Sequence, residues 1–148
     1  MATNEKTSIT VNVEINASLE NVWKCWTTPE YITRWNHASD EWYSPHAEND
    51  LRVGGKFNYR MEAKDGSFGF DFWGIYTRVE HYKSIEYTLG DDRKVKVEFV
   101  STGNKTIVVE TFETESENSV ELQRGGWQAI LDNFKKLAEV ANQPQATS

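Results

Sequence analysis

The sequence is poor in cysteine, in basic residues and in long apolar runs. Its one cysteine, Cys25, permits no disulfide within the chain and fits a reducing compartment. The chain carries 16 Lys and Arg against 23 Asp and Glu, a formal charge of -7. This acidity argues against nucleic acid and anionic membranes as partners, because both bind basic patches. No apolar run approaches the ~20 residues that a membrane-spanning helix needs. We therefore expect no nucleic-acid partner and no membrane partner.

The N-terminal sequence MATNEKTSIT also lacks the basic and then apolar segment of a secretory signal. Together with the lone cysteine, this predicts a cytoplasmic protein. The length of 148 residues is close to the commonest domain size, and no repeat, low-complexity tract or linker divides the chain. We expect a single domain over residues 1–148, with loose ends and an ordered core of about residues 8–141.

Aromatic residues, by contrast, are abundant: six Trp, six Tyr and seven Phe. So many rings in a small chain indicate a heavily aromatic core, an aromatic-lined cavity, or both.

Hydrophobic periodicity predicts the order of the elements. Residues 9–15 alternate between apolar and polar and predict a half-buried strand. Ser18 is placed to cap a short helix, and Pro29 to begin a second one. The pattern is lost over residues 36–50, which predicts a long loop. Further strands, separated by short turns, are predicted at residues 56–63, 68–80, 83–89, 94–100 and 106–113.

A long helix is predicted from about residue 118 to about residue 141. Asn118 and Glu121 have the spacing of a capping box. The order of elements predicts an α+β fold. A curved antiparallel sheet of about six or seven strands would wrap around the C-terminal helix, because the apolar face of the sheet needs a cover.

Several segments together resemble a known family: ASLENVWKCWTTPEYITRW, DLRVGGKFNYRMEAKDG, GFDFWGIYTRVE, ETFETE and ELQRGGWQAILDNFKKLAE. The chain resembles the START-like, birch-pollen-allergen-like (SRPBCC) superfamily. Within it, the chain resembles the family of the C-terminal domain of the activator of heat-shock protein 90 ATPase. The resemblance covers residues 9 to about 141. It implies a helix-grip fold, in which the long helix lies across the open face of the sheet and leaves a cavity between them.

The chain departs from the family pattern after the second helix. Many relatives have Trp-Trp-Gly-Pro where this sequence has Trp35-Asn36-His37-Ala38. In such folds this loop borders the mouth of the cavity, so a relative's ligand does not carry over to this chain.

The long helix has an unusual N-terminal end. Its apolar stripe, which runs from Trp127 to Ala141, predicts burial, but the preceding inward positions are Gln123 and Arg124. Gly125-Gly126 adds two residues that disfavour a helix interior. One interpretation is that this turn roofs the cavity, where Arg124 would bind a carboxylate or phosphate. The other is that the turn overhangs the sheet edge and is solvated.

Glu110 is the most informative carboxylate. It is in register with Val108 and Phe112 on an apolar face, so an inward side chain would need a partner. It either meets Arg124 or Arg60 inside the cavity or forms an ion pair at a strand edge. A buried carboxylate could also act as a general base.

The candidate ligand-binding residues combine rings and polar groups expected near the cavity: Trp35, His37, Trp42, Phe57, Tyr59, Asp71, Trp73, Glu110, Gln123, Arg124 and Trp127. We assign no catalytic residue, no cofactor and no metal. The one cluster of suitable ligand types is His37, Asp40, Glu41 and His46, and its spacing matches no zinc or calcium pattern.

The sequence leaves three functions open. The first is a binding domain, monomeric or weakly dimeric, for a small hydrophobic or amphipathic and partly aromatic molecule. The second, implied by the resemblance, is an enzyme of the cyclase or hydrolase type that uses the same cavity, with Glu110, Asp71 or His37 as acid or base. The third, implied by the family, is a stress-related co-chaperone-like interaction module. We expect no stimulation of heat-shock protein 90 ATPase, because the 148 residues include no separate chaperone-binding domain.

Overall fold

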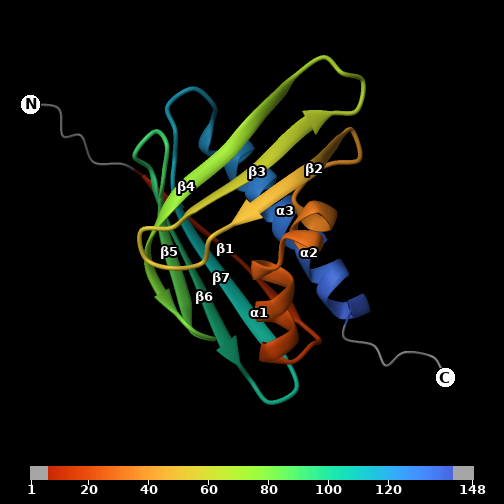
Figure 1. Cartoon of the computed structure of the whole chain (residues 1–148), viewed down its shortest axis with the longest axis vertical. Helices are drawn as coiled ribbons and strands as arrows, with labels where there is room; N and C mark the ends of the chain where they lie inside the picture. Colours follow the sequence, from red (N-terminus) through yellow and green to blue (C-terminus); the bar gives the residue numbers. More distant parts are fainter. Residues whose placement is uncertain (1–6, 142–148) are drawn as a thin grey trace, which may run out of the picture.

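The computed structural model describes residues 7–141, so the expectation of loose ends concerns mainly residues outside this range. The elements follow in the order β1 (Ser8–Ile15), α1 (Leu19–Thr27), α2 (Pro29–Trp35), β2 (Trp42–Asn49), β3 (Lys56–Ala63), β4 (Gly69–Glu80), β5 (Ser84–Leu89), β6 (Lys94–Ser101), β7 (Thr106–Glu113) and α3 (Val120–Ala141). All neighbouring strands are antiparallel, and the sheet order is β1-β7-β6-β5-β4-β3-β2. The sheet curves around α3, which lies across one face of it (Figure 1). The predicted helix-grip α+β fold is confirmed.

β2 is a strand where the sequence predicted a loop, so that prediction is wrong for residues 42–49. The register between β2 and β3 shifts between Tyr43 and His46, which removes the regular alternation that would have indicated a strand. Pro45 lies within this shift. A proline is tolerated in a sheet at a bulge or on an edge strand, and β2 is an edge strand.

The two short helices fill one end of the curved sheet. The Ser18 side chain accepts a hydrogen bond from the Asn21 N–H and caps α1, and Pro29 occupies the first turn of α2, both as predicted. The rings of Trp26 on α1 and Trp35 on α2 stack with their centroids 4.9 Å apart. α3 packs against these two stacked rings through Phe134.

α3 begins slightly later than predicted. Leu122 N–H donates to Ser119 Oγ, so Ser119 caps the helix, and Asn118 instead donates its side-chain amide to Glu115. From Leu131 to Ala138 the predicted apolar face is buried, with Phe134 fully enclosed. Within residues 7–141, no helix is long and apolar enough to cross a membrane.

Candidate functional site

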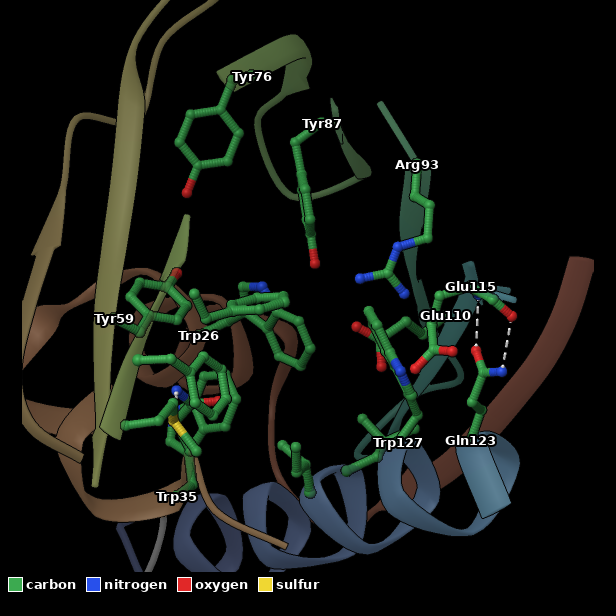
Figure 2. A pocket seen from close by; sticks show the side chains of 16 residues that line it. Trp26, Trp35, Tyr59, Tyr76, Tyr87, Arg93, Glu110, Glu115, Gln123 and Trp127 are labelled. Carbon is green, nitrogen blue, oxygen red and sulfur yellow. Dashed lines mark hydrogen bonds between the residues drawn. The ribbon is translucent and has the colours of Figure 1, made fainter. Parts of the chain in front are cut away.

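A pocket of about 260 Å³ lies between the inner face of the sheet and the N-terminal half of α3 (Figure 2). Aromatic and aliphatic side chains from both layers dominate its wall. Its lining residues are Trp26, Trp35, Asn36, Tyr59, Met61, Phe70, Phe72, Tyr76, Tyr87, Arg93, Glu110, Glu115, Gln123, Trp127, Ile130 and Leu131.

The period of two along β3 and β4 aims their rings into the pocket. Tyr59 of β3 pairs with Phe72 of β4, so both side chains rise from the same face of the sheet. Between Phe72 and Tyr76 the inward position is Gly74. A Cβ there would lie 2.8 Å from the ring of Phe57, so the glycine makes room for that ring behind the pocket wall. The aromatic rings of this wall therefore pack on the ring of Phe57, which lies behind them.

Three tyrosines form the sheet side of the pocket: Tyr59, Tyr76 and Tyr87 are all buried. The Tyr76 hydroxyl donates to Asn49 Oδ1 on β2. Burial is the main cause that raises the pKa of each of these hydroxyls, so all three stay protonated at neutral pH. They offer hydroxyl groups to the pocket without adding charge.

Glu110 is the buried carboxyl group of the site. On β7 it pairs with Val11 of β1 and Val97 of β6, and it is only 6% exposed. Within residues 7–141, its carboxyl group has no hydrogen-bond or ion-pair partner. Burial raises its pKa from 4.5 to about 8, so the group is mainly neutral at pH 7. The prediction that it points inward is confirmed, but neither predicted arginine meets it.

Arg93 is the cation that reaches the pocket. It precedes β6, its side chain is 18% exposed, and its Nε donates to Asp91 Oδ2 at 2.8 Å. In Figure 2 its guanidinium group, the Tyr87 hydroxyl and the Glu110 carboxyl group face the same open space. Three polar groups, from β5, from β7 and from the turn before β6, therefore converge at one end of an otherwise apolar pocket.

Gln123 closes this end of the pocket, but its side chain is already bonded. Its Nε2 donates to the Glu115 carbonyl at 3.0 Å, and its Oε1 accepts from the Glu115 N–H at 2.9 Å (Figure 2). Its Nε2 also donates to the Asn118 carbonyl at 2.8 Å. These bonds tie the loop after β7 to the first turn of α3. Gln123 thus lines the pocket as predicted, with its amide committed to the loop.

Five of the residues proposed from the sequence come together around the pocket: Trp35, Tyr59, Glu110, Gln123 and Trp127. Trp127 stacks on Phe112, with ring centroids 4.0 Å apart and planes 8° apart, which fixes one wall. The other six proposed residues do not line the pocket.

Three of these six lie close to the pocket. Phe57 is buried behind the tyrosines, where it contacts Tyr87 edge to face. Trp42 packs against the lining residue Phe70 at the beginning of β2. His37 follows α2, where its carbonyl accepts a hydrogen bond from Asn133 of α3 and burial lowers the pKa of its ring.

The remaining three are solvent-facing. Asp71 lies on the outer face of β4, 3.6 Å from Arg60, so Arg60 pairs with Asp71 outside the cavity and not with Glu110 as one prediction had it. Trp73 is on the same outer face, beneath Lys56 and against Gly90. Arg124 is exposed on α3. Strand alternation and the helix turn direct these side chains away from the pocket.

The double glycine does not roof the pocket. Gly125 is exposed, Gly126 is partly exposed, and an added Cβ at either would meet no atom within 4 Å. The structure agrees better with the alternative interpretation, in which this turn is solvated. The two glycines nevertheless lie inside α3 rather than at a frayed end. The roof consists of Gln123 and Trp127 instead.

Sequence reasoning missed Tyr87 and Arg93. The sequence did contain a signal for Tyr87, because it lies midway between Ile85 and Leu89 at a spacing of two and so shares their buried face of β5. Arg93 follows the turn residues Asp91 and Asp92, and nothing in that run indicates an inward guanidinium group. Its direction depends on the backbone of the turn, where Asp92 has a φ of 72°.

No metal centre assembles in the part of the chain that the structure describes, since no three His, Cys, Asp or Glu side chains lie close enough to share an ion. Glu110 is the one carboxyl group with a pKa near neutrality in the pocket wall. The chemistry that the site can offer is therefore hydrogen bonding, apolar burial and proton transfer.

Comparison with known proteins identifies the family. The family model described as "Activator of Hsp90 ATPase homolog 1-like protein" matches residues 16–139. No curated protein matches the chain.

Solved structures agree with this assignment. The AHSA1-like protein from Aeromonas hydrophila is 42% identical, with a TM-score of 0.87 over 96% of this chain and 99% of that one. Chr148 from Cytophaga hutchinsonii is 47% identical, with a TM-score of 0.78 over 95% and 99% of the two chains. Protein NE0264 from Nitrosomonas europaea, at 18% identity and a TM-score of 0.77 over 90% and 95%, shares the fold. The chain belongs to the family of Activator of Hsp90 ATPase homolog 1-like proteins.

Proposed function

We propose that this member of the family binds a small, mostly apolar and partly aromatic molecule in the pocket between the sheet and α3. The observation that supports this most directly is the composition of the wall: aromatic and aliphatic side chains surround a few convergent polar groups. Sites for small molecules have this composition, because apolar walls provide affinity and a few polar groups provide orientation.

The volume limits the size of the molecule. A pocket of about 260 Å³ has room for roughly nine water molecules, at the ~30 Å³ that each occupies in the liquid. An occupant with one or two fused rings fits this space. Phe70 lines the pocket and is 39% exposed, so a larger molecule would extend past it into solvent.

A titration with the neutral dye N-phenyl-1-naphthylamine tests the proposal. The purified chain should enhance and blue-shift the emission of the dye. Ile130→Trp places a bulky ring in the pocket wall and should weaken dye binding by about tenfold, a cost of about 1.4 kcal/mol. The matched control is Val140→Trp, at a position on α3 that is 66% exposed, and it should bind the dye like the unmodified chain.

Two results would contradict the proposal: no dye binding by the unmodified chain, or equal binding by Ile130→Trp and Val140→Trp. Thermal melts of both variants establish that they are folded. Native mass spectrometry of freshly purified protein adds a second readout, because a retained small molecule should be lost from Ile130→Trp alone.

Glu110 favours a second candidate, an enzyme that uses the same pocket. A carboxyl group with a pKa of about 8 is matched to proton transfer near neutral pH. Asp71 and His37, the other acids or bases suggested by the sequence, do not line the pocket. Turnover that disappears in Glu110→Gln while dye binding persists would support an enzyme.

A further inference from the structure

We propose that the molecule bound in the pocket carries a carboxylate group, held by the Glu110 carboxyl group, the Tyr87 hydroxyl and the Arg93 guanidinium. This inference rests on the proposed function, because it names the chemical class of the occupant of the same pocket.

The sheet register brings the three groups to one end of the pocket. Val95 of β6 pairs with Tyr87 on one side and with Phe112 on the other. Glu110 is two residues from Phe112 and shares its inward face, and Arg93 precedes β6 two residues before Val95. Strands β5 and β7 and the turn that leads into β6 therefore each direct one polar side chain to the same end of the pocket (Figure 2).

Two of these groups have no partner within the protein. Within residues 7–141, neither the Glu110 carboxyl group nor the Tyr87 hydroxyl makes a hydrogen bond, although Glu110 is 6% exposed and Tyr87 is 7% exposed. The other polar groups of the wall differ, since Tyr76 bonds to Asn49 and Gln123 bonds to the loop. Both residues line the pocket, and within residues 7–141 neither is among the side chains whose polar atoms are fully enclosed without a partner, so these polar atoms face the pocket and can bond to a ligand atom.

All three groups are hydrogen-bond donors near neutral pH. The Glu110 carboxyl group keeps its proton because its pKa is about 8, and burial raises the pKa of Tyr87. Arg93 is a permanent cation that can donate but not accept. Its Nε is engaged by Asp91, and Figure 2 shows its terminal nitrogens directed at the pocket. Three converging donors, one of them charged, select an acceptor-rich anion.

The remaining polar groups at this end do not change that selection. Glu115 accepts hydrogen bonds from the backbone of Glu117 and Asn118, so its carboxylate serves its own loop. The side-chain amide of Asn118, which also donates to Glu115, lowers the pKa of that carboxyl most, and the backbone bonds and the nearby charge of Arg93 lower it further. Burial raises the pKa of Tyr59 and of Tyr76. A cationic head group would instead lie beside Arg93 and would require Glu110 to ionise. A carboxylate forms strong charge-assisted bonds with both a guanidinium and a neutral carboxyl group.

Three probes of matched size test the inference: 2-naphthoate, 2-naphthalenemethanol and 2-naphthylmethylamine. At pH 7, 2-naphthoate should bind about tenfold more tightly than the neutral alcohol, and the cationic amine most weakly. Calorimetry or quenching of tryptophan emission measures all three affinities. Because the carboxylate binds the protonated form of Glu110, its affinity should stay nearly constant from about pH 5.5, where the probe is ionised, to about pH 7, and fall by up to about tenfold per pH unit above pH 8.

Variants assign the selectivity to its residues. Arg93→Met should lose about tenfold in affinity for 2-naphthoate and keep its affinity for 2-naphthalenemethanol, which also shows that the pocket is intact. Arg124→Met is the matched control: it removes the same charge from an exposed position, so all affinities should be unchanged. With Glu110→Gln, the affinity for 2-naphthoate should no longer decline above pH 8.

The outcomes separate the two proposals. If no probe binds, the binding function and this inference both fail. If 2-naphthalenemethanol binds and 2-naphthoate has no advantage, the inference fails and the binding function stands. Tighter binding of the amine, or an equal loss in Arg93→Met and Arg124→Met, would also overturn the inference.

Discussion

The two halves of α3 face the same sheet in different ways. Toward its C-terminal end, Phe134 is fully buried and packs edge to face against the stacked rings of Trp26 and Trp35, with centroids 4.8 and 5.1 Å away. Toward its N-terminal end, Trp127 packs on Phe112 but leaves open space on the side of the tyrosines. One half of the helix closes the core, and the other half roofs a pocket.

The difference arises from the short helices. α1 and α2 fill the space between α3 and one end of the sheet with tryptophan rings. These rings also form one wall of the pocket, and beyond them the space between the sheet and the N-terminal half of α3 stays open. One continuous helix thus stabilises the core at one end and leaves polar groups open to a pocket at the other, because each half meets different neighbours.

The largest effect should follow from opening the packed half. Phe134→Ala removes a side chain that is 0% exposed and should lower the free energy of unfolding by about 3 to 5 kcal/mol. Urea denaturation followed by tryptophan emission measures the change. A loss below about 1 kcal/mol would mean that this half is no better packed than the pocket half.

At the pocket half, Glu110→Gln should change how stability depends on pH. The folded chain holds a proton on Glu110 up to a pKa of about 8, whereas the ordinary value is 4.5. Between these values the unfolded chain has released a proton that the folded chain retains, so stability falls as pH rises from about 4.5 to about 8. From pH 5 to pH 8 this contribution amounts to roughly 3 kcal/mol.

Glu110→Gln should lack that contribution. The measurement is the difference in unfolding free energy between the unmodified chain and the variant, determined by urea melts at several pH values. A difference that does not change with pH would mean that the Glu110 carboxyl group is solvated or paired in solution.

A smaller loss should follow from Gln123→Ala. The substitution removes three hydrogen bonds between α3 and the loop after β7 and should cost about 1 to 2 kcal/mol. Gln128→Ala is the matched control on the same helix, since its amide donates to the exposed carbonyl of Asn12 and to Asp132. Equal losses in the two variants would remove the special role of Gln123.

The smallest effect should be a gain from Gly126→Ala. An added Cβ there meets no atom within 4 Å, so improved helix propensity should stabilise the chain by about 0.5 to 1 kcal/mol without affecting dye binding. Gly90→Ala is the contrasting control: its Cβ would lie 2.5 Å from the ring of Trp73, so it should destabilise. A marked loss of dye binding in Gly126→Ala would restore the glycine-roof interpretation.

Local patterns in the sequence were sufficient for most of the architecture. Alternation predicted six of the seven strands, and the three-and-four spacing predicted α3. β2 escaped because Pro45 and a register shift remove the alternation on which the prediction relied. The inward direction of Glu110 was also readable, since Val108 and Phe112 lie on the same face.

The sequence alone could not decide which strand face the helix covers. Alternation separates Trp73 from Phe72 and Tyr76, but the pattern is the same whichever face is buried. Only the packing of α3 places Tyr76 in the pocket and Trp73 outside. The same limit explains why the sequence pointed to Arg124 of α3 whereas the structure places Arg93 at the pocket. Arg93 lies in a turn far from α3 along the chain, and only the fold brings that turn and the helix together.

The sequence by itself thus determined the elements, their order and the two faces of each strand, because these depend on neighbours within a few residues. Only the tertiary structure decided that Glu110, Tyr87 and Arg93 share one end of a pocket. Their convergence depends on the pairing of β5, β6 and β7 and on where α3 ends its close packing. Those contacts join residues distant along the chain, and no local pattern encodes them.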